Sequence, residues 1–286
     1  MMEPLKRLAA INDLSGVGKC SLTVTIPVVS ATGVECACLP TTVLSTHTCG
    51  FTGYTVRDLS QDIVPIAEHW KREGLHFDAI CTGYMANPEQ ADGIEKAVEL
   101  IRSPDTLRIV DPAMADNGAY YPMLGEPIRD AFRRLIAGAD VITPNVTEAA
   151  LLTGLPYLEP PYSEEYIRQL LDALAALGAK IVAITSVFTP DGLVGNVALD
   201  TRTGEVFRSM HMAMEGSFHG AGDVFTASLS ALLVRGASLH TAMELSALLV
   251  CDSIERTIRR GIPRHMGVDF ESALPFYSKR VAELLG

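Results

Sequence analysis

The sequence lacks the features of a membrane or nucleic-acid-binding protein. None of its apolar runs approaches the roughly 20 residues that span a bilayer. The first apolar stretch ends at Asn12 and Asp13, which leaves no signal-peptide core. Acidic residues outnumber basic ones by 34 to 23, and no Lys/Arg cluster offsets the net charge of −11. We therefore expect no nucleic-acid partner, no membrane partner and a cytoplasmic location.

Two common site motifs are also missing. The six cysteines show no Cys-x-x-Cys spacing and no paired histidines accompany them, so the sequence does not predict a zinc site. The pair Gly18–Lys19 does not complete a Walker phosphate loop, because its spacing requires glycine at Asp13 and a hydroxyl residue at Cys20. The loop after the first strand can still bind a ligand. It would not do so as a Walker motif.

Short apolar runs alternate with helical segments along the whole chain, and 48% of the residues are apolar. This alternation predicts one α/β domain over residues 1–286, with a mostly parallel sheet, helices on both faces and an edge hairpin. The expected strands are 7–11, 34–39 (extended to 44), 78–82, 107–110, 140–143 and 180–185, with a hairpin of 193–199 and 205–210. The expected helices are 60–71 and 163–177 with serine caps, 88–102, 125–136, one beginning at 144–148, one following 223, 238–259 and 270–285.

The most informative stretch is the glycine turn at residues 219–223, His-Gly-Ala-Gly-Asp, which opens into a buried helix. Glycines let the backbone approach a ligand closely, and the free N–H groups of a helix N-terminus attract an anion such as phosphate. A carboxylate at that point, Asp223, could take a proton from an alcohol that attacks the phosphate. The alternative is an ordinary glycine turn followed by a first-turn acid.

Three carboxylates are expected at one edge of the sheet. Ligands of open α/β sheets sit outside the carboxyl ends of the strands, where the pattern places Asp111, Glu148 and Asp223. Mg²⁺ takes a few carboxylates together with waters and phosphate oxygens, so two of them could organise a magnesium nucleotide while the third acts as base. Asn145 lies three residues before Glu148 at a helix start, so both can face one site. Taken singly, each could be a helix cap or a solvated acid.

These motifs together resemble a known enzyme family. The glycine turn with Asp223, the earlier Asn145-x-x-Glu148 and Asp111–Pro112 after a central strand resemble the ribokinase superfamily of ATP-dependent small-molecule kinases. Leu-Ser-Thr-His-Thr at 44–48, Thr-Gly-Tyr at 82–84 and Ile-Thr-Ser at 184–186 are similar to the pyridoxal (vitamin B6) kinase branch. The segment 13–21 looks most like the bacterial enzymes labelled pyridoxamine kinases. The resemblance covers about residues 8–260.

The resemblance implies a ribokinase-like fold and a B6-salvage kinase that uses ATP and Mg²⁺, with a monovalent cation such as K⁺ as a further candidate and a homodimer as the assembly. It implies that Asp223 is the base and that a loop over 113–122 covers the site during turnover. The remaining residues that it implies fall into four groups: Gly220, Ala221 and Gly222 at the anion hole; Asp13, His47, Thr48 and Tyr84 around the substrate ring; Thr143, Thr185 and Ser186 at the nucleotide; and Asp111, Asn145 and Glu148 at the metal, with Glu148 acting through water.

One position departs from the B6 pattern. Many pyridoxal kinases have serine where this chain has Asp13, and an aspartate there is more like the hydroxymethylpyrimidine kinases of thiamin synthesis. Those enzymes often carry cysteine in place of Asp223. Cys49 lies beside the ring-binding segment, where some relatives capture the pyridoxal aldehyde with a thiol. The alternatives are therefore a hydroxymethylpyrimidine kinase or another small-molecule kinase of the superfamily, and a catalytically silent binding protein on the same fold.

Overall fold

The computed structural model describes residues 5–122, 124–214 and 216–286. In these ranges the strands are β1 (Arg7–Ser15), β2 (Glu35–Leu44), β3 (Val56–Asp58), β4 (Ala79–Thr82), β5 (Leu107–Val110), β6 (Ala115–Asp116), β7 (Ala119–Tyr120), β8 (Val141–Ile142), β9 (Ile181–Phe188), β10 (Leu193–Asp200) and β11 (Val206–Met212). The helices are α1 (Leu22–Ala31), α2 (Ser60–Arg72), α3 (Glu89–Ile101), α4 (Glu126–Ile136), α5 (Val146–Thr153), α6 (Glu164–Ala175), α7 (Ala221–Val234), α8 (Leu239–Arg260) and α9 (Leu274–Leu285), with a 3₁₀ turn η1 (Arg264–Met266).

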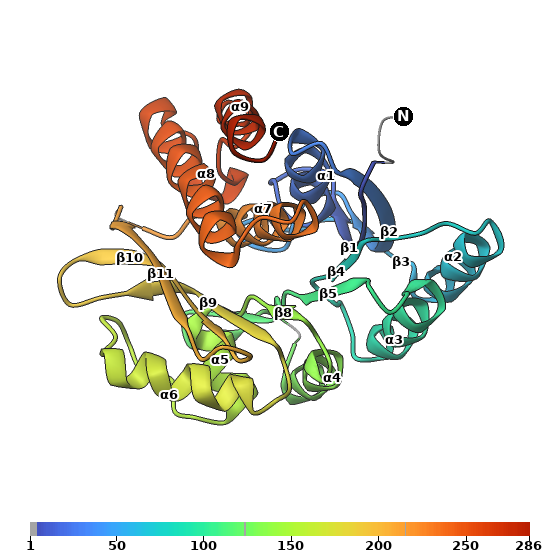
Figure 1. Cartoon of the computed structure of the whole chain (residues 1–286), viewed down its shortest axis with the longest axis horizontal. Helices are drawn as coiled ribbons and strands as arrows, with labels where there is room; N and C mark the ends of the chain where they lie inside the picture. Colours follow the sequence, from blue (N-terminus) through green and yellow to red (C-terminus); the bar gives the residue numbers. More distant parts are fainter. Residues whose placement is uncertain (1–4, 123, 215) are drawn as a thin grey trace.

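One large sheet runs through the middle of the molecule, in the strand order β11–β10–β9–β8–β5–β4–β1–β2–β3 (Figure 1). The strands β2, β1, β4, β5, β8 and β9 are parallel to one another. The hairpin β10–β11 adds antiparallel strands at one edge. The predicted mostly parallel sheet with an edge hairpin is therefore confirmed, and its parallel strands all end at the same edge.

Helices cover both faces of the sheet and form two cores (Figure 1). Helices α2 to α6 lie on one face, while α1, α7, α8 and α9 lie on the other. The residues of β1 alternate between the two cores: Ala9 and Ile11 face the first, and Leu8 and Ala10 face the second. A strand that is buried on both faces needs a continuous apolar run, which explains the composition of its first half.

Several element boundaries differ from the prediction. Helix α1 was not predicted, because it contains Pro27, which lacks the N–H that a helix interior uses, and several β-branched residues. Ser60 was expected as a helix cap, but it is the first helical residue, and its N–H donates to Asp58 Oδ1 at 2.9 Å. The last helix begins at Leu274 instead of Phe270, since Pro275 fits a first helical turn.

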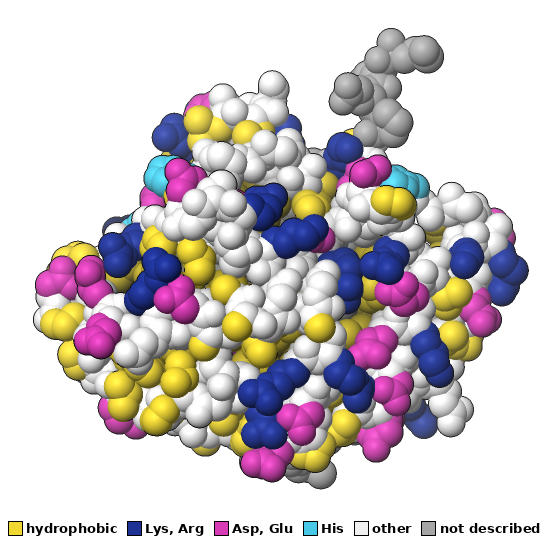
Figure 2. Space-filling view, turned by 60° about the horizontal axis from the view of Figure 1, so that its bottom comes forward, with side chains coloured by type: hydrophobic (Ala, Val, Ile, Leu, Met, Phe, Trp, Pro, Cys, Tyr) yellow, Lys and Arg dark blue, Asp and Glu magenta, His cyan; other side chains and the backbone are white. Residues whose placement is uncertain are grey.

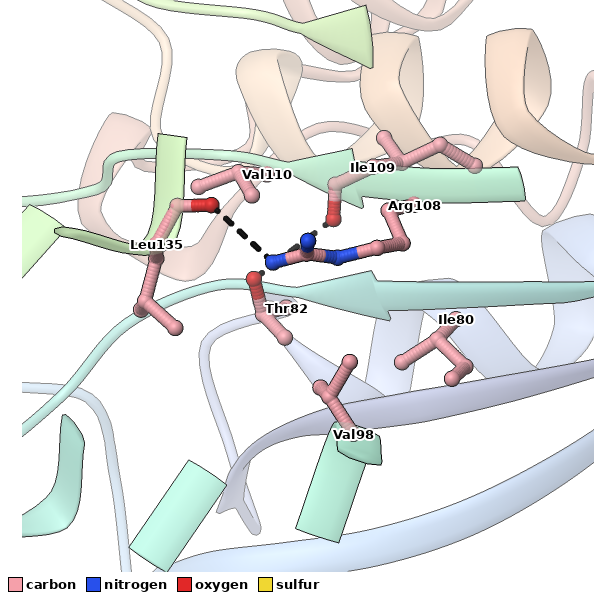
Figure 3. A pocket seen from close by; sticks show the side chains of 7 residues that line it. All are labelled: Ile80, Thr82, Val98, Arg108, Ile109, Val110 and Leu135. Carbon is pink, nitrogen blue, oxygen red and sulfur yellow. Dashed lines mark hydrogen bonds between the residues drawn. The ribbon is translucent and has the colours of Figure 1, made fainter. Parts of the chain in front are cut away.

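Arg108 of β5 fastens the neighbouring helix to the sheet (Figure 3). Its guanidinium donates to the carbonyl oxygens of Leu135 at 3.3 Å and Gly138 at 3.2 Å, at the end of α4. The last carbonyls of a helix have no partner inside the helix, so the bond to Leu135 satisfies one of them, and the bond to Gly138 holds the loop that follows. Together they hold the helix end against the strand that leads to Asp111.

On the face shown in Figure 2, basic and acidic side chains are interspersed. Among the exposed ion pairs of the structure, Arg134 of α4 pairs with Asp92 and Glu95 of α3 at 2.7 and 3.0 Å. Such exposed pairs contribute little to stability individually. In the described ranges, no helix is long and apolar enough to cross a membrane.

Candidate active site

The glycine turn lies at the N-terminus of α7, as predicted. Gly220 is the N-cap residue with a φ of 78°, in the left-handed region that glycine adopts without strain. A Cβ at this position would lie 2.1 Å from the carbonyl oxygen of Lys19, so the backbone leaves room only for glycine. The N–H groups of Gly222 and Asp223 belong to the first helical turn and have no carbonyl within the helix to bond. The turn can therefore bind an anion through its backbone.

The loop between β1 and α1 forms the floor beneath this turn. Lys19 and Ser21 have φ angles of 56° and 52°, which non-glycine residues rarely adopt. The Ser21 N–H faces the carboxylate of Asp223 and lowers its pKa, against the effect of burial. Backbone strain of this kind costs free energy and tends to occur at functional sites. Here it accompanies a loop that reaches under the turn and holds the proposed base in place.

Three carboxylates meet at the carboxyl ends of the central strands. Burial, followed by the charges of Asp111 and Asp13, raises the pKa of Asp223 to about 8. Burial also raises the pKa of Asp111 to about 7. Asp111 and Asp223 line one small cavity together with Asn12 and Thr226. Of the three carboxylates expected at this edge, Asp111 and Asp223 line the same cavity, and Glu148 is close enough for the Asp111 charge to raise its pKa; Asp13 joins them.

Two buried threonine hydroxyls lie next to Asp111 on the side of the protein interior. Thr226, one turn after Asp223 on α7, lowers the pKa of the Asp111 carboxyl and so opposes the effect of burial. Its Oγ1 also donates to Oγ1 of Thr143 at 2.9 Å, and both threonines are buried. Thr143 was predicted at the nucleotide. In this structure its hydroxyl is engaged inside the protein, where it supports the carboxylate network.

Asp13 lies near the end of the central strand β1 and is only 3% exposed. Its Oδ2 accepts a hydrogen bond from Ser15 Oγ at 2.9 Å, and the hydroxyls of Ser21 and Ser15 lower its pKa. Burial nevertheless dominates and raises its pKa. Tyr84 follows β4 on the same edge, and burial together with the Asp13 charge raises the pKa of Tyr84 to about 12. A buried acid with hydroxyl partners would gain from a cationic ligand group.

Residues 45–50 form a loop that we call the substrate loop. His47 stabilises this loop, and neither of its ring nitrogens is free to bind a ligand. Its Nδ1 accepts from the N–H of Cys49 at 3.0 Å, so its Nε2 carries the proton and donates to the His265 carbonyl at 2.7 Å. Burial lowers the pKa of His47, which favours the neutral ring. The ring packs against Phe51 and His219 with centroid distances of 5.0 and 5.5 Å. Any contact of His47 with a ligand would therefore use its ring carbon atoms.

Asn145 and Glu148 form a reciprocal capping box at the start of α5. The Asn145 N–H donates to Glu148 Oε2, and the Glu148 N–H donates to Asn145 Oδ1, both at 2.9 Å. Glu148 Oε1 accepts further bonds from the N–H groups of Met114 at 3.1 Å and Ala115 at 3.4 Å. Burial and the charge of Asp111 raise the pKa of Glu148, while the N–H donors oppose this rise.

Thr185 and Ser186 lie in β9, where its register with β10 shifts between Gly195 and Val197. Thr185 is buried, whereas Ser186 is exposed and has a φ of 58°. A β-bulge of this kind redirects a side chain and often occurs beside an active site. Ser186 is thus available to a ligand at the edge where α7 begins.

Some residues of this region were not predicted as site residues. Ser21 and Thr226 contact the carboxylates, and Asn12 lines the cavity between them. His219 lies against the His47 ring, and its pKa is lowered by burial. Only Thr226 had a readable signal, since it lies three residues after Asp223 on a helix and therefore on the same face.

The described residues fit a metal that is held mainly by its nucleotide. No group of three or more His, Cys, Asp or Glu residues within them could hold a metal ion alone. Asn145 Oδ1 and both carboxylate oxygens of Glu148 already accept backbone N–H groups. Asp111 remains as the carboxylate that could bind Mg²⁺ together with phosphate oxygens and water.

Comparisons with known proteins agree with this arrangement. The phosphomethylpyrimidine kinase family profile matches residues 24–268. The chain is 34% identical over 185 residues to a pyridoxine/pyridoxal/pyridoxamine kinase of Bordetella avium, a match over 63% of this chain and 60% of that relative. A pyridoxal kinase structure from Lactobacillus plantarum is 33% identical, with 98% of each chain covered and a TM-score of 0.87.

A second structure carries a bound ligand. It comes from a Bacteroides thetaiotaomicron protein described as a phosphomethylpyrimidine kinase and crystallised with pyridoxal. The chain is 33% identical to it, with 96% of each chain covered and a TM-score of 0.91. These likenesses confirm the ribokinase-like architecture that the sequence motifs implied.

Proposed function

The chain belongs to the phosphomethylpyrimidine kinase family, and we propose that it transfers the γ-phosphoryl group of ATP to the hydroxymethyl group of a B6 vitamer. The observation that carries this proposal is the convergence of Asp13, Asp111 and Asp223 at the N-terminus of α7. A helix N-terminus that binds phosphate, a carboxylate for a metal and a carboxylate base are the parts that phosphoryl transfer requires.

In this proposal Asp223 accepts the proton of the substrate hydroxyl as the oxygen forms its bond to phosphorus. The bond between the γ-phosphorus and the bridging oxygen breaks, and ADP leaves. The N–H groups of Gly220, Ala221 and Gly222, in the glycine turn and the first residues of α7, hold the transferring group. Bound Mg²⁺ would neutralise phosphate charge beside Asp111. Thr185 and the exposed Ser186 would lie near the nucleotide phosphates.

Asp13 suits a substrate ring that carries a positive charge or a hydrogen-bond donor, such as a protonated pyridine. Its carboxylate is buried among hydroxyl groups, so it would gain from a protonated ring nitrogen or a neighbouring ammonium group. An aminomethyl substituent adds such a donor, whereas pyridoxal offers an aldehyde acceptor. We therefore propose that kcat/KM for pyridoxamine equals or exceeds kcat/KM for pyridoxal. Thr48 and Tyr84 would complete the surroundings of the ring, with His47 as their support. A cytoplasmic homodimer is part of the proposal.

Steady-state kinetics with pyridoxamine, pyridoxal, hydroxymethylpyrimidine and ribose test the proposal. We expect turnover of both vitamers, weaker turnover of the pyrimidine and none of ribose. Asp13→Ser should lower kcat/KM roughly 10- to 150-fold more for the substrate with a protonated ring than for one with a neutral ring. Ser15→Ala is the matched control, because it removes one hydroxyl partner and leaves the carboxylate in place. Faster turnover of the pyrimidine or of ribose would overturn the assignment.

The alternative substrate is hydroxymethylpyrimidine. The name of the matching family favours it, and so does an acidic residue at position 13. The amino group of its aminopyrimidine ring could also donate a hydrogen bond to the Asp13 carboxylate. The same panel of substrates decides between the two, since both share the base, the anion hole and the nucleotide.

A further inference from the structure

The capping box of α5 reaches beyond its own helix to the hairpin β6–β7. Two N–H groups at the base of this hairpin, those of Met114 and Ala115, donate to Glu148 Oε1. In the opposite direction, Asn145 Nδ2 donates to the Ala115 carbonyl at 2.8 Å. Near the hairpin tip, the Gly118 N–H donates to Thr147 Oγ1 at 3.0 Å. Three polar residues of one helix start, Asn145, Thr147 and Glu148, thus contact one hairpin.

The hairpin base is buried, while its tip is exposed. Met114 and Ala115 have no exposed surface, whereas residues 116–119 are exposed. Gly118 has a φ of 76°, and a Cβ there would lie 2.8 Å from the ring of Tyr157. The hairpin is therefore held at its buried base, and at its exposed tip Gly118 lies against the ring of Tyr157. The hydrogen bonds to α5 fix its direction.

The held hairpin carries Asp116 toward the reaction site. The Asp116 charge acts on His219, which directly precedes Gly220, and on Cys49 in the substrate loop. The hairpin base directly follows Asp111 and Pro112 in the chain. A shift of the hairpin would therefore move both the carboxylate that follows β5 and the Asp116 charge beside His219.

We infer that Asn145, Thr147 and Glu148 are positioning residues, which hold the β6–β7 hairpin in register with the glycine turn, and that Glu148 acts through this hairpin and not through the metal. This inference rests on the proposed kinase function for its consequence in catalysis. Its structural part does not depend on the substrate. The hydrogen bonds support this inference, because the Glu148 carboxylate accepts three of them from backbone N–H groups. Two of these groups belong to the hairpin base and one to the N-cap of α5.

Hydrogen exchange and kinetics on the same variants test the inference. Glu148→Gln replaces one accepting oxygen with an NH₂ group that cannot accept, and Thr147→Val removes the acceptor for Gly118. Both variants should raise amide exchange in residues 114–120 by about tenfold, the effect of losing one ordinary hydrogen bond. Both should lower kcat and leave the Mg²⁺ concentration for half-maximal rate unchanged. Thr147→Ser keeps the hydroxyl and should restore the wild-type values.

Thr153→Val is the control, because the Thr153 hydroxyl bonds carbonyls of α5 itself and makes no bond to the hairpin. It should change neither the exchange of residues 114–120 nor kcat. Unchanged exchange in Glu148→Gln would overturn the inference, as would a raised Mg²⁺ requirement in Glu148→Gln alone. The exchange measurement uses the protein without substrate. It therefore gives a result even if the chain phosphorylates none of the vitamers, and the two proposals can fail separately.

Discussion

The charge of Asp111 should control the pH at which Asp223 works as a base. A carboxyl group with a pKa of about 8 is about one tenth ionised at pH 7 and about nine tenths ionised at pH 9. Only the ionised form can accept the substrate proton, so kcat/KM should rise about tenfold per pH unit below pH 8 and then level off. Asp111→Asn removes a neighbouring negative charge that raises this pKa. The rise should therefore move to lower pH.

The size of the shift follows from Coulomb's law. Two unit charges about 6 Å apart repel by about 3 kcal/mol at an effective dielectric constant of about 20, which corresponds to about two pH units. Asp111 has a raised pKa itself, about 7, and is only partly ionised at neutral pH. We therefore expect a shift of about one pH unit, from the rise centred near pH 8 toward pH 7.

The assay is the pH profile of kcat/KM for wild type and Asp111→Asn at subsaturating vitamer and MgATP, where the profile reports the ligand-free protein. Ionisation of the vitamer also shapes such a profile, but it is identical for both proteins and cancels in the comparison. Asp111→Asn will lower the absolute rate if Asp111 binds the metal, so the midpoint is the quantity compared. Asp62→Asn, on the exposed first turn of α2, removes a charge far from the site and should leave the midpoint in place. An unmoved midpoint, or one displaced to higher pH, would refute the electrostatic reasoning.

Three further outcomes follow from the site. Asp223→Asn should lower kcat by about 10²–10⁴-fold. The difference in Tm between this variant and wild type should shift in favour of the variant from pH 5 to pH 8. Folded wild type binds a proton more tightly at Asp223 than the unfolded chain does, so wild type loses stability over this range and the variant does not. Thermal unfolding at both pH values checks the second effect, and equal differences would contradict it. Gly220→Ala should lower the free energy of unfolding by about 1–3 kcal/mol, since its methyl group meets the Lys19 carbonyl; Gly222→Ala faces open space and should keep wild-type stability, as denaturant titrations would show. The Cys49 thiol, whose pKa burial raises, should be alkylated more slowly than a free thiol at pH 7.5; faster labelling in site-resolved mass spectrometry would exclude this environment.

The sequence predicted the parts of the site that follow from strand order. Parallel strands end at one edge, so Asp111 after β5 and Asp13 at the end of β1 could be placed together from the alternation of strands and helices. The glycine turn was recognisable because two glycines and an acid precede a long apolar helix. Ser163 was predicted correctly as a helix cap, and its Oγ accepts the Tyr166 N–H at 3.2 Å.

The contacts that tertiary packing decides could not be predicted. The spacing of Asn145 and Glu148 fits a shared ligand site as well as a capping box, and only the position of the β6–β7 hairpin shows which groups they bond. The sequence predicted His47 beside a ligand, but it could not show that the His47 Nε2–H donates a hydrogen bond to the carbonyl of His265, more than 200 residues later in a 3₁₀ turn. The sequence of helix α1 shows no helical spacing of apolar and polar residues, because the helix is buried and contains a proline. A short apolar run of this kind cannot be distinguished from a buried strand by its pattern alone.

The site buries three carboxylates whose ionised forms each cost free energy in the absence of a ligand. Asp13, Asp111 and Asp223 are crowded together, and burial raises the pKa of each. Such a cluster is destabilising when it is fully ionised, so the free protein keeps part of it protonated near neutral pH. A protonated pyridine ring at Asp13 and Mg²⁺ at Asp111 would each bring positive charge and favour ionisation of the neighbouring acid. The same charges would lower the pKa of Asp223. The base would thereby become active when both substrates are present, and the cost of burying these acids would be offset by substrate binding.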